Sequence, residues 1–194
     1  MSAVIAPRHA PTDPELLSRI AQGDLASLGD LYERYSGDVR RFVGRLGALG
    51  VQPGEVDDLV QSTFLLVARA SHGYDGRVAA RAWLFGLAAN VARQHRRSLA
   101  RLARKLAAWA AEPKSHGEPS PAELLAAKEA AVRAQRAIDG LPWKKREVFL
   151  MVVVEGISGE QAAAALGIPL ATVWTRLHHA RRDIRRLLAE EETP

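Results

Sequence analysis

Cysteine is absent from the 194-residue sequence. Without thiols the chain cannot form disulfides, use a thiol nucleophile, or build iron–sulfur and cysteine-ligated zinc sites. The histidine pair His178–His179 is a poor alternative metal site, because adjacent residues project about 100° apart on a helix. We therefore expect a protein without a metal and without a cofactor.

Long hydrophobic runs are also missing. The longest, from Val148 to Val154, is far shorter than the roughly 20 residues that span a bilayer. The N-terminal letters MSAVIAPRHAPTDPE lack the basic start and the sustained apolar segment of a signal peptide. These absences predict a cytoplasmic protein that does not insert into a membrane.

Aromatic residues are few, at 6% of the sequence, and runs of β-branched residues are scarce. Alanine, leucine and arginine dominate instead, and these residues favour helices over strands. We therefore predict an all-α protein. Catalytic patterns are missing too: the sequence shows no Ser/His/Asp triad, P-loop or kinase motif, and no paired carboxylates in an apolar setting. An enzyme is therefore not expected.

Helical periodicity runs through the first half of the chain. Pro14 marks a helix start, and apolar residues then recur at spacings of three and four over Leu28–Leu46. Two further helices are predicted over 55–70 and 79–97, with a loop at 71–76 between them. These elements predict a helical module in the first half.

A linker divides the chain in two. The letters EPKSHGEPSP, from Glu112 to Pro121, hold three prolines and a glycine. We predict two small helical domains with few core contacts between them. The predicted boundaries are a flexible N-terminal arm at 1–13, a first domain at 14–111, the flexible linker at 112–121, and a second domain at 122–194.

The second domain carries a helix-turn-helix pattern. One short helix begins after Ser158 and ends at Gly167, and a second helix begins near Pro169. The predicted shared core is Leu166, Ile168, Val173 and Leu177. The second helix exposes Thr172, Trp174, Thr175, Arg176, His178 and His179 and is expected to lie in a major groove. We expect base specificity from Trp174, Thr175, His178 and His179. The arginines Arg176, Arg181 and Arg182 are expected mostly to hold phosphates. Trp174 either contacts a thymine methyl or sugar edge, or packs on another helix.

Positive charge is concentrated rather than spread. The net charge is only +5, with a pI near 10.0. Yet the stretch from Arg93 to Lys105 holds several basic residues and no acid, and a second basic run follows the helix-turn-helix. Local positive surface is what nucleic-acid binding requires, so we favour DNA binding over a solvated helical hairpin.

Longer segments resemble the extracytoplasmic-function group of the sigma-70 family. Asp57–Leu65 (DDLVQSTFL) resembles the helix by which such factors bind the RNA polymerase clamp. Ala82–Asn90 (AWLFGLAAN) resembles the family's tryptophan-to-asparagine segment, and Leu141–Pro142 with Thr172–Leu177 resembles its fourth region. The resemblance implies a sigma factor that directs core RNA polymerase to promoters and melts the −10 element.

The resemblance assigns residues to three tasks. Polymerase binding is assigned to Asp57, Asp58, Gln61 and Phe64. Recognition of the −10 element is assigned to Tyr74, Asp75, Asn90, Arg93, Gln94 and Arg97. Recognition of the −35 element is assigned to Thr172, Trp174, Thr175, Arg176, His178, His179, Arg181 and Arg182. The implied partners are core RNA polymerase, promoter DNA and an anti-sigma factor.

Two other functions are weighed against this one. A conventional helix-turn-helix repressor or activator would bind duplex DNA tightly by itself, but it leaves the acidic helix near Asp57 and the basic face near Arg93 unexplained. A nucleic-acid-processing enzyme would need a metal or an acid–base constellation, and the sequence shows neither. Pull-down with core polymerase, followed by transcription from a candidate promoter, separates the three.

Overall fold

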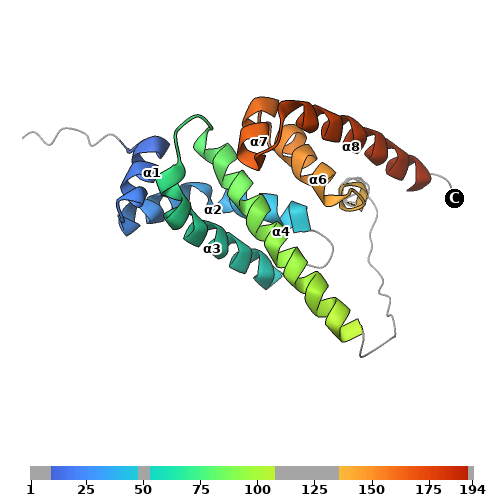
Figure 1. Cartoon of the computed structure of the whole chain (residues 1–194), viewed down its shortest axis with the longest axis horizontal. Coiled ribbons are helices and arrows are strands. Elements are labelled where there is room, and N and C mark those ends of the chain that lie inside the picture. Colours follow the sequence, from blue (N-terminus) through green and yellow to red (C-terminus); the bar gives the residue numbers. More distant parts are fainter. Residues whose placement is uncertain (1–9, 48–52, 108–135, 192–194) are drawn as a thin grey trace, which may run out of the picture.

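A computed structural model of the chain describes residues 10–47, 53–107 and 136–191. Helices are the only regular secondary structure in these ranges, which confirms the all-α prediction (Figure 1). The elements are α1 (Asp13–Ala21), α2 (Leu25–Gly47), α3 (Pro53–Ala70), η1 (Ser71–Gly73), α4 (Ala80–Ala107), α6 (Trp143–Phe149), η2 (Leu150–Val154), α7 (Gly159–Leu166) and α8 (Leu170–Glu191).

Local signals set the first helices. The backbone N–H of Thr12 donates to Glu15 Oε2 over 2.8 Å at the start of α1. Asp24 caps α2, accepting from the N–H of Ala26 at 2.9 Å and from the Ser27 hydroxyl at 2.7 Å. The hydrogen bonds from Ser27 lower the pKa of Asp24, so the cap is charged at neutral pH.

The first module packs α1 to α4 around one apolar core. The rings of Phe42 on α2 and Phe85 on α4 stack with their centroids 4.6 Å apart, and both side chains are fully buried. Helix α4 is longer than the predicted 79–97, because it continues through the basic run to Ala107. The basic run therefore lies on a regular helix.

The second module contains the predicted helix-turn-helix. Ser158 Oγ accepts from the N–H of Gln161 at 3.3 Å and begins α7, and Gly167 ends it with a left-handed φ of 64°. The apolar residues Val173 and Leu177 of α8 pack with Val148 and Ala163, and Leu166 and Ile168 border them. The predicted shared core is confirmed.

The two modules are packed against each other, and the expectation of few core contacts between them is wrong. Trp143, Leu150 and Met151 belong to the same core cluster as Phe42 and Phe85. In Figure 1, α7 lies against α4. A proline-rich linker indicates how a chain is joined, but it does not reveal whether the joined parts have complementary surfaces.

A glycine permits the closest approach between the modules. A Cβ added to Gly86 on α4 would lie 2.3 Å from the backbone oxygen of Ala165 on α7. Only a residue without a side chain fits at this position. The linker at 112–121 and residues 1–9 of the arm at 1–13 lie outside the described residues, so the predicted domain boundaries there stay predictions.

None of the helices described has the combination of length and apolar character needed to cross a membrane.

Candidate functional site

The acidic helix is α3, and its four predicted residues differ in exposure. Asp58 and Gln61 are exposed, whereas Phe64 is only 4% exposed and Asp57 pairs with Arg40 of α2. The Phe64 ring meets the Tyr32 ring edge to face, with the centroids 4.8 Å apart. Phe64 therefore packs beneath the exposed face of α3, and the side chains of Asp58 and Gln61 lie on that face.

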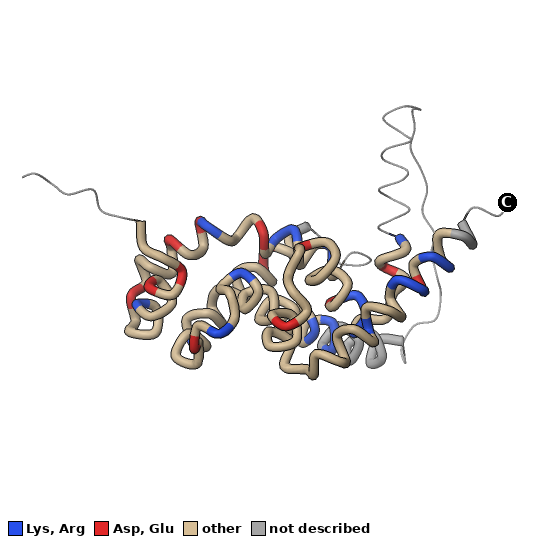
Figure 2. Tube along the Cα trace, turned by 90° about the horizontal axis from the view of Figure 1, so that it is seen from above, with Lys and Arg blue, Asp and Glu red and all other residues tan. Residues whose placement is uncertain are grey.

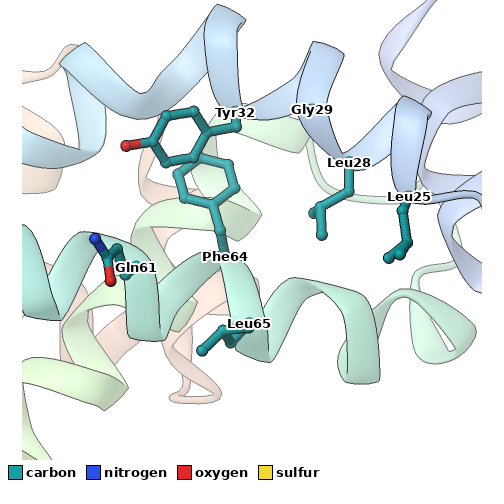
Figure 3. A pocket seen from close by; sticks show the side chains of 7 residues that line it. All are labelled: Leu25, Leu28, Gly29, Tyr32, Gln61, Phe64 and Leu65. Carbon is teal, nitrogen blue, oxygen red and sulfur yellow. The ribbon is translucent and has the colours of Figure 1, made fainter.

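An apolar groove lies beside these residues, between α2 and α3 (Figure 3). Its volume is about 390 Å³, and Leu28, Tyr32 and Phe64 line it. Leu25 and Leu65 flank it with exposed fractions of 74% and 67%. Neither leucine is among the predicted polymerase-binding residues. The available signal was that Leu65 lies one helical turn beyond Gln61 on a polar face.

The loop between η1 and α4 holds Tyr74 and Asp75 in different roles. The Tyr74 hydroxyl donates to the Val78 carbonyl over 2.7 Å, and its ring packs 5.1 Å from Trp83. Burial raises the pKa of Tyr74, with the nearby Asp13 and Asp75 adding to the effect. Tyr74 thus holds the loop's shape, while Asp75 stands exposed at its tip beside Arg77.

Helix α4 carries the other residues assigned to the −10 element. Gln94 and Arg97 are exposed, and Asn90 and Arg93 are half-buried. Arg93 donates to Glu147 Oε2 of α6 over 2.6 Å. This predicted DNA residue is therefore held by a carboxylate of the other module.

The recognition helix α8 divides its predicted residues between two faces. Trp174, His178, Arg181 and Arg182 line one groove of about 540 Å³, together with Leu177 and Arg185. We call this face the outer surface of α8, and Figure 2 shows how basic residues recur along the helix. Arg176 points elsewhere, donating to Glu147 Oε1 over 3.2 Å.

Four predicted residues of α8 also make contacts within the protein. Trp174 packs over α7, since a Cβ on Gly159 would lie 2.5 Å from its ring, yet its exposed fraction is 47%. The Thr175 hydroxyl donates to the Ala171 carbonyl over 2.9 Å. The rings of His178 and His179 meet edge to face at 5.6 Å. Packing on another helix is thus the observed alternative for Trp174 in the free chain.

A second basic site lies between the modules, and we call it the inner cleft. It is bounded by α4, α6 and α8 and has a volume of about 180 Å³. Its lining residues are Arg93, Arg96, Arg97, Trp143, Lys144, Glu147, Leu166, Ile168 and Arg176. The cleft brings together arginines that were assigned to two different promoter elements.

Glu147 holds the inner cleft together. The side chain of this residue is 3% exposed, and its two carboxylate oxygens accept from Arg93 of the first module and Arg176 of the second. A buried carboxylate needs such partners, because an unpaired one is costly to desolvate. Glu147 is not among the predicted site residues, because a glutamate on a short helix gives no sign of burial in the sequence.

A second glutamate ties the modules at the other end of the interface. Glu155 accepts from Arg45 at 3.0 Å and from Arg81 at 2.6 Å. Burial alone would lower the pKa of Arg81, but the carboxylates of Asp38 and Glu155 outweigh it and raise that pKa. Arg81 therefore stays charged and holds Glu155 in place.

No cluster of three or more histidine, aspartate or glutamate side chains with the geometry of a metal site occurs within residues 10–47, 53–107 and 136–191. The chemistry of the described surfaces is instead that of binding: one apolar groove, one basic helix face and one basic cleft.

The chain matches known sequence families over most of its length. Residues 31–102 match sigma-70 region 2, and residues 122–184 match sigma-70 region 4. The RNA polymerase sigma factor NccH of Alcaligenes xylosoxydans xylosoxydans is 28% identical over 93% of this chain and 96% of its own. The ECF RNA polymerase sigma-E factor of Escherichia coli strain K12 is 28% identical over 89% and 92%.

Solved structures agree with these matches. CnrH, solved with the cytosolic domain of CnrY, superposes with a TM-score of 0.63 at 26% identity, over 93% of this chain and 99% of that one. The sigma factor RpoE, solved with the anti-sigma factor NepR from Bartonella quintana, has a TM-score of 0.62 at 21% identity, over 83% and 96%, and is alike in fold.

Proposed function

Because this chain belongs to the extracytoplasmic-function group of the sigma-70 family, it is an RNA polymerase sigma factor that recognises promoters, and we propose that three of its surfaces divide this work. The α2–α3 groove binds core polymerase. The loop before α4 and the exposed face of α4 bind the −10 element. The outer surface of α8 binds the −35 element as duplex.

The outer surface of α8 is the observation that carries this proposal. It combines an exposed helix of a helix-turn-helix with Trp174, His178, Arg181 and Arg182 in one groove. Early positions of a groove-inserted helix face base edges, whereas later arginines meet phosphates. We assign base contacts to Trp174 and His178, and phosphate contacts to Arg181 and Arg182.

For polymerase binding, the exposed leucines supply the apolar surface that Asp58 and Gln61 alone do not provide. Protein interfaces place apolar side chains at the centre and charged groups at the rim. Leu25 and Leu65 provide the apolar part, and Asp58 and Gln61 provide a polar edge beside it. Asp57 orients α3 on α2 through its pair with Arg40.

Polymerase binding is tested by competition for core enzyme. Leu65→Asp, and separately Asp58→Arg with Gln61→Ala, should each weaken core binding while leaving far-UV helicity unchanged. Val153→Asp is the matched control, because Val153 is also an exposed apolar residue but lies on η2, away from the groove. Unchanged competition by both groove variants would refute this assignment.

Binding to the −10 element requires Arg93 to exchange its partner. In the packed arrangement Arg93 bonds Glu147, so it must release this carboxylate before it meets a phosphate. Asn90, Gln94 and Arg97 lie within two turns of it on the same helix. Opening of the DNA costs unstacking energy, which binding of extruded bases and the displaced strand offsets.

Promoter-library transcription with permanganate footprinting tests the division between the two elements. His178→Ala should change which −35 sequences are used, at about 1–3 kcal/mol for the affected base pair. Asn90→Ala or Arg97→Ala should impair −10 use or opening and leave the −35 preference unchanged. The reverse pattern would show that the two assignments are exchanged.

The remaining parts of the proposal concern activity, location and regulation. This chain performs no catalysis itself, and it works in the cytoplasm with core polymerase. CnrH and RpoE were solved with CnrY and the anti-sigma factor NepR, and by analogy we assign this chain an anti-sigma partner. Co-purification from cells with and without a tagged chain tests for such a partner.

A further inference from the structure

The inner cleft has a charge composition that its structural role does not require. Among the described residues, five cations line it, namely Arg93, Arg96, Arg97, Lys144 and Arg176, together with the carboxylate of Glu147. The Glu147–Arg93 pair joins the two modules, whereas the Glu147–Arg176 pair lies within the second module. Arg96 and Lys144 add positive charge to that of the two arginines with which this carboxylate pairs.

The walls of the cleft strengthen the positive electrostatic potential inside it. Arg96 stands over the Trp143 ring, with its guanidinium carbon 4.9 Å from the ring centroid, and Leu166 and Ile168 complete the lining. Clefts lined by one sign of charge between low-dielectric walls concentrate counter-ions. The stacked guanidinium is also held in one orientation, so an anion that binds it meets a prearranged donor.

Trp143 contributes a second, independent observation. Its indole Nε1 is buried and has no hydrogen-bond partner among the residues the structure describes, although Trp143 lines the cleft. Buried donors in native proteins nearly always have an acceptor. An acceptor that enters beside this ring would satisfy the donor after a small turn of the indole.

We propose that the inner cleft binds a phosphate group between the two modules. Phosphate oxygens fit the forked N–H groups of arginine, and several oxygens on one centre let Arg96 and Lys144 act together. Glu147 repels an anion, so the phosphate sits on the side of the cleft away from that carboxylate. A volume of about 180 Å³ suits a small phosphorylated group rather than a folded segment.

Such a ligand would act on the arrangement of the modules. Arg96 belongs to α4, whereas Lys144 belongs to α6, so one phosphate would bridge both modules. A ligand that binds only the packed arrangement shifts the population toward it. Because Arg93 and Arg176 are both held by Glu147 in that arrangement, a free phosphorylated compound bound there would hold back promoter engagement.

The test uses the full chain and the indole signals of its four tryptophans in ¹H–¹⁵N spectra. Trp143→Phe assigns the Trp143 signal, and sodium pyrophosphate is titrated against sodium chloride of equal ionic strength. We expect a saturable shift of the Trp143 indole with a fixed stoichiometry. A shift that stays linear, or that chloride reproduces, would overturn the proposal.

Matched variants separate the cleft from general positive charge. Lys144→Ala should weaken pyrophosphate binding about tenfold, which is the scale of one charge-assisted hydrogen bond. Arg181→Ala removes the same charge from the outer surface of α8 and should leave this binding unchanged. Equal loss in both variants would mean that pyrophosphate senses only net charge, and the proposal would fail.

A second titration distinguishes the source of the phosphate. If the natural ligand is a free phosphorylated compound, pyrophosphate should bind more tightly than a short oligothymidylate. If it is the backbone of single-stranded DNA, the oligonucleotide should shift the Trp143 indole at lower concentration. Core polymerase competition by Lys144→Ala stays at the wild-type level in either case, so failure of this inference is distinguishable from failure of the proposed function.

Discussion

The inner cleft and the outer surface of α8 are both rich in arginine, yet they differ in what faces the charges. In the cleft, Arg93 and Arg176 meet the buried carboxylate of Glu147. On the outer surface, Arg181 and Arg185 are exposed, and the acid nearest to Arg182 is Asp183 at 3.9 Å. Similar residues thus hold a buried carboxylate at one surface and are exposed to solvent at the other.

The difference teaches that basic sequence does not equal DNA-binding surface. Exposed arginines are hydrated and can exchange water and counter-ions for phosphates. An arginine held by a buried carboxylate must first give up that partner, which then remains buried without compensation. Arg176 has the sequence position of a DNA contact, but in the free chain it has the environment of a structural residue.

The largest effect is expected when the cleft loses its carboxylate. Glu147→Gln should lower the free energy of unfolding by about 3 kcal/mol, because it leaves Arg93 and Arg176 facing each other without a counter-charge. Urea denaturation followed by circular dichroism measures the change. Glu33→Gln, an exposed position on α2, is the control and should change little. Equal effects of the two substitutions would contradict a special role for Glu147.

A smaller effect is expected from wedging the modules apart without changing any charge. Gly86→Ala places a Cβ against the Ala165 carbonyl and should destabilise the chain by about 1–2 kcal/mol, even though alanine favours the helix. Gly44→Ala on α2 meets open space and should instead stabilise by about 0.5–1 kcal/mol. Thermal unfolding of both variants would show opposite shifts. Stabilisation by both would mean that α7 does not pack closely on α4.

The two arginine environments should also differ in the salt dependence of DNA binding. Arg182→Ala should weaken binding to random-sequence duplex and reduce the slope of log affinity against log salt by about 0.9, as expected for one lost phosphate contact. Arg176→Ala should leave this slope unchanged while the modules are packed. Fluorescence anisotropy over a range of salt concentrations measures both. If Arg176→Ala changed the slope as much as Arg182→Ala, Arg176 would reach DNA despite Glu147.

The smallest effect on stability is expected at Asp183, which lies beside the outer surface of α8. The hydrogen bond from Lys145, 2.5 Å from Asp183, lowers the pKa of that carboxyl, and Lys145 and nearby arginines add to this. Because the folded pKa is depressed, the stabilisation is present above the usual Asp pKa of about 3.9 and is lost as pH falls through the folded value.

Asp183→Asn should therefore cost about 0.5 kcal/mol at neutral pH, and the difference from wild type should shrink below about pH 4. Urea denaturation at a series of pH values measures it. A difference that grew toward low pH would show that the carboxyl is not held in its charged form.

Much of the fold follows from local pattern. The capping residue Ser158, the left-handed glycine Gly167 and the apolar residues Val173 and Leu177 each act within a few residues or across one tight turn. Such interactions are specified by neighbouring letters, so the helix-turn-helix and the presence of the first-module helices could be read in advance. The exposed face of α8 could be predicted for the same reason, because it follows from the spacing of apolar residues within one helix.

Other parts of the site depend on residues far apart in the chain. Leu25 and Leu65 form one groove only because α2 and α3 lie side by side, and Glu147 meets Arg93 only because α6 lies on α4. Helical periodicity shows which face of a helix is buried, but not which element covers it. Arg176 was therefore grouped with its helix neighbours, and Glu147 and Glu155 were missed.

By itself, the sequence determined the helical class, the helix-turn-helix and the polar and apolar faces of its helices, because these arise from interactions within a turn or two of chain. The tertiary structure alone decided that the modules share a core, that Gly86 admits the Ala165 carbonyl, and that one buried glutamate joins Arg93 to Arg176. The physical reason is that burial and pairing of a charge depend on the surface packed against it, and that surface comes from a distant part of the chain.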